Sequence, residues 1–146
     1  MTPAPETPDQ PGATAARPVP VPTPDTREWW ARIDQEELTV PHCRACDHFF
    51  LFPRSACPAC ASREVELVPA AGTGTVASFV VNHRAPAGFT APYVLALVQL
   101  AEGPLLMGNV ATDAPDDLVL DAPVRVGFEA RGEHRVVRFD LVEAGA

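Results

Sequence analysis

The feature that most constrains this sequence is a set of four cysteines arranged in two Cys-x-x-Cys pairs. Cys43 and Cys46 form the first pair, Cys57 and Cys60 form the second, and the chain has no other cysteine. A Cys-x-x-Cys pair forms a turn that holds its two sulfur atoms on one side of a tight loop. Ten intervening residues allow a short hairpin to return the second pair, so that four thiolates surround Zn²⁺ at about 2.3 Å per bond. The spacing therefore predicts a zinc ribbon over residues 41–62.

The expected metal is structural, because four thiolates leave no open coordination position for water or substrate. A disulfide framework would need an oxidising compartment. The first residues show neither the basic nor the apolar region of an export signal, so we expect a cytoplasmic protein with reduced cysteines. A thioredoxin-type site needs only one pair, whereas Cys57-Pro58-Ala59-Cys60 is similar to an iron site of rubredoxin type, which a colourless protein would exclude. His42 and His48 are expected beside the ligands and not among them.

The ribbon is too short to bury a core of its own. Metal ligation is therefore expected to supply much of its folding free energy, on the order of 10 kcal/mol in zinc-finger peptides.

Charge and hydropathy limit the partners of the chain. No stretch approaches the roughly 20 apolar residues that cross a bilayer, so no membrane contact is expected. The formal net charge is -8, and four zinc-bound thiolates would add about two more negative charges. Such a surface repels a phosphate backbone and disfavours nucleic acid.

The N-terminal part divides into a tail and a helix. Residues 1–24 contain eight prolines and almost no large apolar side chain, which predicts a disordered tail or linker. Residues 25–40 are expected to hold a short helix that ends near Leu38, with Asp25 as its cap and Glu28 as the second half of a capping box.

Trp29, Trp30 and Ile33 form an apolar stripe on this helix. Two interpretations stay open: the stripe packs on the ribbon and barrel of its own chain, or it lies in a groove of a partner, where aromatic anchors are enriched.

From Glu64 onward the apolar residues alternate with a period of two, which predicts strands. Five strands are expected, at residues 74–83, 93–100, 105–111, 124–130 and 134–142. The two tight turns are 101–104 and 131–133, and the only long connection is 112–123, which falls between strands three and four. That placement is typical of a five-stranded OB barrel, here over residues 63–146, with an SH3-like or other small barrel as the alternative. The expected fold is mainly β.

The second expected strand is apolar on both faces. Its inward residues alternate with Tyr93, Leu95 and Leu97, and only Gln99 is polar on the outward face. Either the N-terminal helix or the ribbon covers this face, or it is a protein interface.

The sequence offers little catalytic machinery. It contains no Gly-x-Ser-x-Gly, phosphate-binding loop, His-Glu-x-x-His or dinucleotide motif. His83 is interpreted as an exposed loop histidine, and the acidic residues of 113–121 lack calcium-site spacing and are interpreted as a solvated loop. We therefore expect no catalytic residue in this chain by itself.

Several motifs occur in a specific order. They are Arg27-Glu28-Trp29-Trp30, the first cysteine pair, Phe52-Pro53-Arg54, the second pair, Gly72-Thr73-Gly74-Thr75-Val76, Ala91-Pro92-Tyr93-Val94-Leu95-Ala96-Leu97-Val98 and Glu102-Gly103. Over residues 26–142 this order resembles the zinc-ribbon OB-fold proteins of the domain-of-unknown-function-35 (DUF35) family. The usual glycine after the first pair is Asp47 here, which departs from the family pattern.

The resemblance implies an accessory subunit of a thiolase-superfamily enzyme, such as a sterol-carrier-type thiolase or a retro-aldolase of steroid side-chain degradation. In that family the partner supplies the catalytic residues, the ribbon and helix dock to it, and the barrel helps to shape the acyl-CoA entrance. Some members are fused behind a hot-dog-fold hydratase domain, and residues 1–24 resemble the linker of such a fusion.

On this interpretation the partner interface would include the two tryptophans, Ile33 and the outward residues of the second strand. The candidate contacts for CoA phosphates are Arg44, Arg54, Arg63 and Arg84. The alternative function is a single-stranded nucleic-acid-binding OB module, which would need a basic groove with stacking aromatic residues. A free-standing enzyme is the third alternative.

Overall fold

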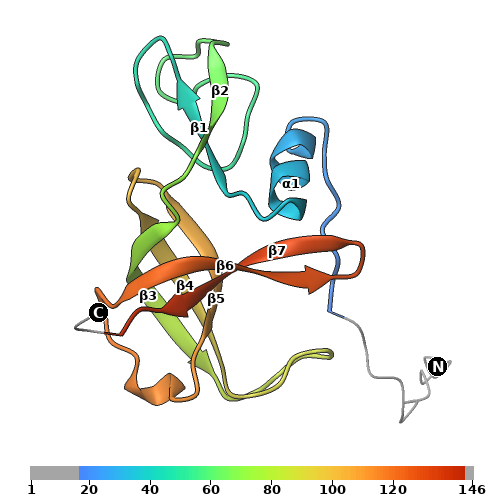
Figure 1. Cartoon of the computed structure of the whole chain (residues 1–146), viewed down its shortest axis with the longest axis vertical. Coiled ribbons are helices and arrows are strands. Elements are labelled where there is room, and N and C mark those ends of the chain that lie inside the picture. Colours follow the sequence, from blue (N-terminus) through green and yellow to red (C-terminus); the bar gives the residue numbers. More distant parts are fainter. Residues whose placement is uncertain (1–16, 144–146) are drawn as a thin grey trace, which may run out of the picture.

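The structure, a computed structural model, describes residues 17–143. It contains a small two-stranded ribbon, one helix and a five-stranded barrel (Figure 1). The elements, in chain order, are α1 (Arg27–Asp34), β1 (Thr39–Cys43), β2 (Val65–Pro69), β3 (Thr73–Asn82), β4 (Tyr93–Leu100), β5 (Leu105–Ala111), η1 (Pro115–Asp117), β6 (Pro123–Arg131) and β7 (His134–Leu141).

The barrel has the OB strand order β3-β4-β5-β7-β6. Neighbouring strands are antiparallel except β5 and β7, which are parallel, and β3 also pairs with β6, so that every strand has two neighbours. The long connection between β5 and β6 carries η1, as the spacing of the turns predicts. The mainly β, OB-fold prediction is confirmed, and the five strands agree with their predicted ranges to within one residue at each end.

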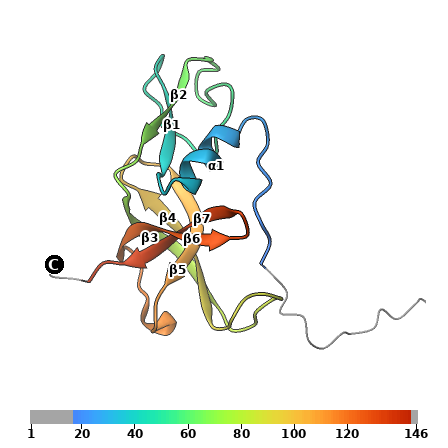
Figure 2. The same ribbon diagram turned by 45° about the vertical axis from the view of Figure 1, so that its right-hand side comes forward.

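The ribbon sheet includes β2, which we did not predict as a strand and whose residues fall in the range expected to form the barrel. β2 lies within residues 63–146 but pairs antiparallel with β1, from Thr39 opposite Pro69 to Cys43 opposite Val65. The barrel strands therefore begin at Thr73. Residues 44–64 form the loops between the two ribbon strands, and both cysteine pairs lie at the end of this sheet (Figures 1 and 2).

The helix is shorter than predicted, because it begins at Arg27 with Thr26 at the N-cap position and ends at Asp34. Asp25 makes no cap, and no side chain hydrogen-bonds to the free amides of the first turn. Instead, the Thr26 hydroxyl hydrogen-bonds with the amide and the hydroxyl of Thr23, in the turn that precedes the helix. Local turn contacts thus replace the predicted capping box.

One hydrophobic core joins the helix, the base of the ribbon and the barrel. Trp29, Ile33 and Val40 belong to the same buried cluster as barrel residues such as Val98 and Phe139. A second, much smaller cluster contains Cys43, Phe50 and Cys57, with Val65 packed against it. The far end of the ribbon therefore has little apolar burial of its own.

The tail was predicted over residues 1–24, and its residues 1–16 lie outside the described part of the chain. Residues 17–24 are described, and they run beside the β6–β7 hairpin toward α1 (Figures 1 and 2). Arg17 pairs with Glu129 at 2.8 Å, and Arg131 donates a hydrogen bond to the backbone oxygen of Pro18. This part of the segment contacts the barrel.

Candidate metal centre and apolar docking surface

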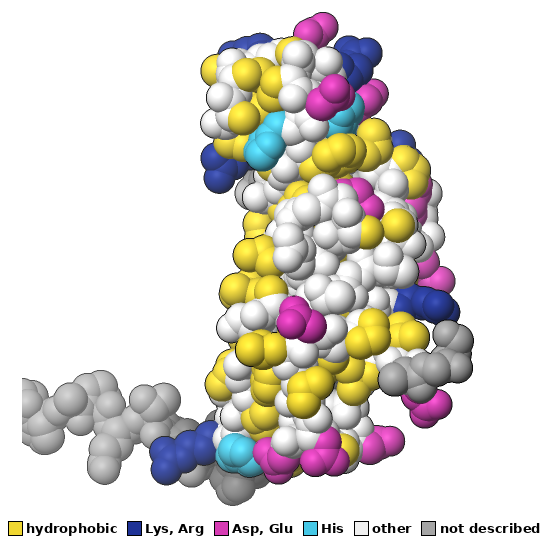
Figure 3. All heavy atoms as spheres, turned by 90° about the vertical axis from the view of Figure 1, so that its left-hand side faces the viewer, with side chains coloured by type: hydrophobic (Ala, Val, Ile, Leu, Met, Phe, Trp, Pro, Cys, Tyr) yellow, Lys and Arg dark blue, Asp and Glu magenta, His cyan; other side chains and the backbone are white. Residues whose placement is uncertain are grey.

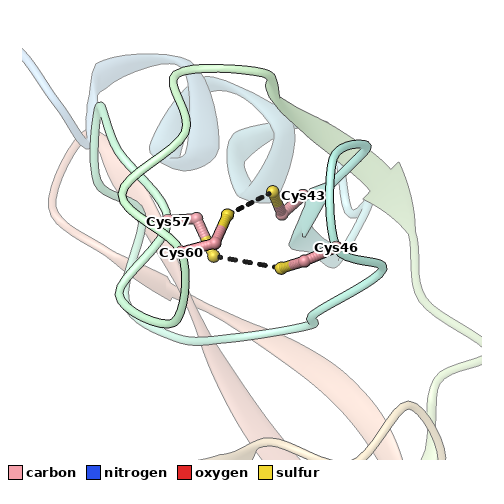
Figure 4. Close-up of side chains that lie close together, drawn as sticks. All are labelled: Cys43, Cys46, Cys57 and Cys60. Atoms are coloured by element: carbon pink, nitrogen blue, oxygen red, sulfur yellow. Dashed lines mark hydrogen bonds between the residues drawn. The ribbon is translucent and has the colours of Figure 1, made fainter.

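The four cysteines converge at the far end of the ribbon, where their side chains point toward one another from two loops (Figure 4). Their sulfur atoms all lie within 4.8 Å of one another. The Sγ atoms of Cys43 and Cys60 are 3.6 Å apart, and those of Cys46 and Cys57 are 3.7 Å apart. A tetrahedral ion with bonds of about 2.3 Å holds its sulfur ligands about 3.8 Å apart. The free thiols therefore fit a tetrahedral metal site and are not disulfide-bonded.

The two cysteine pairs are built alike. The amide of Asp47 donates to the oxygen of Cys43, and the amide of Ala61 donates to the oxygen of Cys57, each at 2.8 Å. Asp47 and Ala61 both adopt left-handed backbone conformations, with φ of 59° and 63°. Glycine adopts this conformation most readily, and aspartate tolerates it. Asp47 therefore keeps the turn at the position where the family usually has glycine.

The close thiols shift one another's pKa values. A hydrogen bond with the backbone of His48 lowers the pKa of Cys46, but desolvation and three neighbouring thiols outweigh it and raise the pKa to about 12. For Cys57, desolvation is outweighed by backbone amides and neighbouring thiols, which lower the pKa to about 7. One thiol thus ionises at the expense of the others. A bound positive ion would favour the ionised form of all four thiols.

The two histidines near the first pair lie outside the sulfur cluster. The ring of His42 lies 3.2 Å from Glu66 and 3.1 Å from Asp47. Its pKa is raised, chiefly by the hydrogen bond with Glu66. His48 stacks on Phe50. Both rings therefore orient the loops around the cysteines.

Of the predicted interface residues, Trp29 and Ile33 are buried inside the chain itself, with 2% and 0% of their surface exposed. The Trp29 indole donates to the backbone oxygen of Thr39 at 2.9 Å. The expectation that these two side chains face a partner is wrong, because the helix packs them against β1 and β7. Trp30 is half-buried, and Phe52 lies edge-on to Trp29 with about half of its surface exposed. Phe52 is therefore an exposed aromatic side chain that was not among the predicted interface residues.

The outward residues of β3, β4 and β5 form a surface that we call the outer apolar face. It consists of Val80, Leu95, Leu97, Leu105 and Met107. Val80, Leu105 and Met107 are each about half exposed, at 48%, 49% and 57%. A shallow hollow of about 170 Å³ lies between Val80, Leu97 and Met107. All residues that line this hollow belong to β3, β4 and β5, and none belongs to the helix or the ribbon.

Tyr93, also predicted at the interface, lies at the end of β4, where its ring packs against Phe89 of the β3–β4 loop.

Hydrophobic side chains are frequent along the barrel, and charged ones gather toward its lower end and on the ribbon (Figure 3).

The four candidate arginines do not form one site. Arg54 and Arg63 line a hollow of about 360 Å³ between the ribbon and the start of α1, together with Asp25, Glu28 and Glu66. Arg44 is exposed on the ribbon, and Arg84 is exposed in the β3–β4 loop. Only Arg54 and Arg63 therefore share a site.

The other candidates of the sequence analysis are a loop histidine and the acidic residues of the β5–β6 connection. His83 is exposed and lies 3.7 Å from Asp116. Within residues 17–143, the four cysteines are the only cluster of three or more histidine, cysteine or acidic side chains that could share an ion. No helix in this part of the chain has the length and apolar character that a membrane span requires.

Comparisons with known proteins agree with this architecture. Residues 30–66 match the family described as the ChsH2 rubredoxin-like zinc ribbon domain, and residues 67–129 match the ChsH2 C-terminal OB-fold domain. A solved chain described as "Ltp2-ChsH2(DUF35) aldolase" superposes with a TM-score of 0.78 and 34% identity, over 84% of this chain and 98% of that one.

Curated relatives fall into two groups. A DUF35 domain-containing scaffold protein of Methanocaldococcus jannaschii is 33% identical over 68% of this chain and 73% of its own length. A probable enoyl-CoA hydratase alpha subunit of Thermomonospora curvata is 40% identical over 75% of this chain. The 3-oxo-4,17-pregnadiene-20-carboxyl-CoA hydratase alpha subunit of Mycobacterium tuberculosis is 34% identical over 71%. The chain spans about a third of the length of these two hydratase subunits, at 35% and 33%.

Proposed function

Because this chain belongs to the DUF35 family of zinc-ribbon and OB-fold proteins, which includes the ChsH2 C-terminal domains, we propose that it is an accessory subunit of a thiolase-superfamily enzyme. It binds and stabilises a sterol-carrier-type thiolase or a retro-aldolase of steroid side-chain degradation. The similar solved chain, whose name joins Ltp2 and ChsH2 in one aldolase, supports this choice of partner. The chain supplies no catalytic group in this proposal.

The observation that carries the proposal is the uncovered outer apolar face. Contiguous exposed apolar surface, centred on Leu97 and Met107, is typical of a protein interface. The same strands carry the ligand face in nucleic-acid-binding OB folds, but β4 and β5 contain no lysine or arginine. The face therefore supports a protein partner and opposes the nucleic-acid alternative.

The metal in this proposal is a structural zinc ion, held by Cys43, Cys46, Cys57 and Cys60. The sulfur distances and the match of residues 30–66 to a zinc ribbon domain support it. When bound, the ion neutralises the thiolates and fixes the two loops. With four protein ligands it has no position for a substrate.

Two finer parts of the proposal concern ligands. Acyl-CoA would bind through the complex. Arg54 and Arg63 are the first residues to test for the CoA phosphates, and they would have to outweigh the charges of Asp25, Glu28 and Glu66 in the same hollow. A hot-dog-fold hydratase is a second proposed partner, supported by the names of the two hydratase subunits that contain a similar region.

The test is co-purification with a thiolase-superfamily aldolase encoded by the same organism. We expect the wild-type chain to elute with it as a hetero-oligomer, and Met107→Glu to lower the affinity at least about tenfold, because it buries a charge in the interface. Val119→Glu is the matched control, since Val119 is 63% exposed on the β5–β6 connection, away from this face. Its affinity should stay unchanged.

Equal affinity of Met107→Glu and wild type would exclude the outer apolar face as the docking surface. Failure of the wild-type chain to bind any such aldolase or thiolase would overturn the accessory-subunit proposal itself. Retention of the chain by single-stranded oligonucleotides would favour the alternative function.

A further inference from the structure

The segment before α1 makes specific contacts with the barrel that the proposed function does not use. In Arg17–Pro24 every second residue is a proline, so that Arg17, Val19, Val21 and Thr23 each precede one. Proline fixes its own φ and disfavours the helical region for the preceding residue. The segment is therefore held in an extended conformation before it binds, and it loses little conformational entropy on docking.

Three kinds of contact fix the start of this segment. The guanidinium of Arg17 donates to Glu129 at 2.8 Å and lies over the ring of Phe89, 4.3 Å from the ring centre. Arg131 donates to the backbone oxygen of Pro18 at 3.3 Å and holds Glu129 at 2.6 Å. One arginine of the segment thus joins the β3–β4 loop to β6.

The third contact is steric. Gly132, in the turn between β6 and β7, has a φ of 62°, and a Cβ atom at this position would lie 2.9 Å from a methyl group of Val19. The absence of a side chain at residue 132 therefore makes room for Val19. Residues 17–19 therefore make an ion pair, a backbone hydrogen bond and a close steric contact with the barrel.

Arg17 also lines a cavity. A cavity of about 190 Å³ lies against β4 and β5, and its lining includes Arg17, Tyr93, Asn109 and Arg138. Tyr93 packs on Phe89, which in turn lies under Arg17. Arg17 therefore forms part of one wall of the cavity and also contacts the β3–β4 loop through Phe89.

We infer that Phe89, Glu129, Arg131 and Gly132 form a recognition site for an extended Arg-Pro-Val-Pro segment. Residues 17–20 of the chain occupy this site as a strap, which holds Phe89 of the β3–β4 loop, residues 83–92, against Tyr93 at the edge of the cavity. Access to the cavity depends on whether the strap is docked.

The experiment measures hydrogen exchange of the Phe89 amide in the full zinc-loaded chain, because this amide donates to Pro86 within the loop. Arg17→Ala should speed its exchange about three- to tenfold, through loss of the ion pair and the cation–π contact. Arg27→Ala is the matched control, since Arg27 is an exposed arginine of α1 with no ion pair in the described residues. Exchange of the β4 core amide of Val98 should not change in either variant.

A second variant tests the site from the barrel side. Gly132→Asn introduces a residue that tolerates the positive φ of this position, but its Cβ atom would lie against Val19. It should speed Phe89 exchange by a similar factor. A peptide of residues 14–22, added in trans at about 1 mM, should restore slow exchange to Arg17→Ala, whereas the same peptide carrying Arg17→Glu should not.

Wild-type exchange of Phe89 in both variants would overturn the strap. Equal acceleration of Phe89 and Val98 would also overturn it, because the contacts would then serve global stability only. Rescue by both peptides would overturn recognition of Arg17. None of these results depends on an aldolase partner.

Discussion

The ribbon and the barrel differ in what holds them together. The barrel surrounds a continuous cluster of buried apolar side chains, whereas the buried cluster at the far end of the ribbon contains only Phe50 and two cysteines. The base of the ribbon shares the barrel core through Val40 and α1. Apolar burial thus decreases along the molecule from the barrel to the cysteine loops, and the need for a metal ion increases in the same direction.

Removal of the metal should give the largest difference between the ribbon and the barrel. Chelation, or Cys57→Ser, should unfold the cysteine loops while β3–β7 stay folded, because the ion supplies on the order of 10 kcal/mol to the ribbon. Backbone amide spectra should then lose the dispersed signals of residues 44–64 only. Ser55→Ala, an exposed change in the same loop, should keep them. Loss of the barrel signals as well would show that both regions depend on the ion.

Phe139→Ala tests the barrel side. Phe139 is fully buried, so its truncation should lower the free energy of unfolding by about 3–5 kcal/mol, measured in denaturant. The metal content of the folded variant should stay at the wild-type value. Phe52→Ala, which truncates a half-exposed phenylalanine, should cost much less. A metal-depleted Phe139→Ala variant would contradict the independence of the two regions.

Trp29→Phe tests the connection between the regions. It keeps an aromatic ring in the core but leaves the buried oxygen of Thr39 without its donor. We expect a loss of about 1–3 kcal/mol in the free energy of unfolding. Hydrogen exchange should rise at β1 and α1 more than at β4. Equal protection in all three elements would show that this hydrogen bond does not couple ribbon and barrel.

Asp34 joins α1 to the β6–β7 hairpin, accepting a bond from the Arg135 amide at 2.8 Å and contacting the His134 ring at 2.9 Å. Desolvation raises the pKa of Asp34, but the Arg135 amide and His134 outweigh it and lower the pKa below its ordinary value. The ionised carboxylate therefore stabilises the fold above the ordinary range of about 4, and this contribution is lost as the pH falls through and below it.

Asp34→Asn should accordingly be about 1 kcal/mol less stable than wild type at pH 7, and the difference should shrink at acid pH. Denaturant unfolding at both pH values measures it. Asp117→Asn, in the exposed β5–β6 connection, should show no such pH dependence. A constant difference at all pH values would exclude the carboxylate charge as the cause.

The smallest expected effect is stabilising. Ala61 holds a φ of 63°, which glycine adopts without strain, so Ala61→Gly should strengthen the second cysteine loop by about 0.5–1 kcal/mol. Competition with a chelator should show tighter metal binding. Ala59→Gly, in the same loop at ordinary φ, should bind metal no more tightly than wild type. Equal gains from both changes would exclude relief of backbone strain.

Features set by short-range pattern could be predicted from the sequence. Alternation of apolar residues indicated the five barrel strands because one face of each is buried, and the cysteine spacing placed four sulfur atoms together because each pair needs only a local turn. The long connection between β5 and β6 likewise followed from turn residues alone.

Features that depend on distant residues could not be predicted in this way. The burial of Trp29 and Ile33 depends on β7, a hundred residues away, and helical periodicity does not say which surface a stripe meets. β2 pairs with β1 and not with the barrel, although its sequence alternates like the strands that follow. The ordered proline segment depends on Glu129 and Phe89, which no local pattern connects to Arg17.

The pairing of β4 on both sides has a consequence for evolution as well as for assembly. This central strand of the outer apolar face pairs with β3 and β5 along its length and offers no free backbone edge to a foreign strand, so a companion docked on this face must recognise side chains. Exchanging a few outward residues of β4 and β5 would then redirect the molecule to a new companion without disturbing its hydrogen-bonded frame. One scaffold could in this way come to serve several different enzymes.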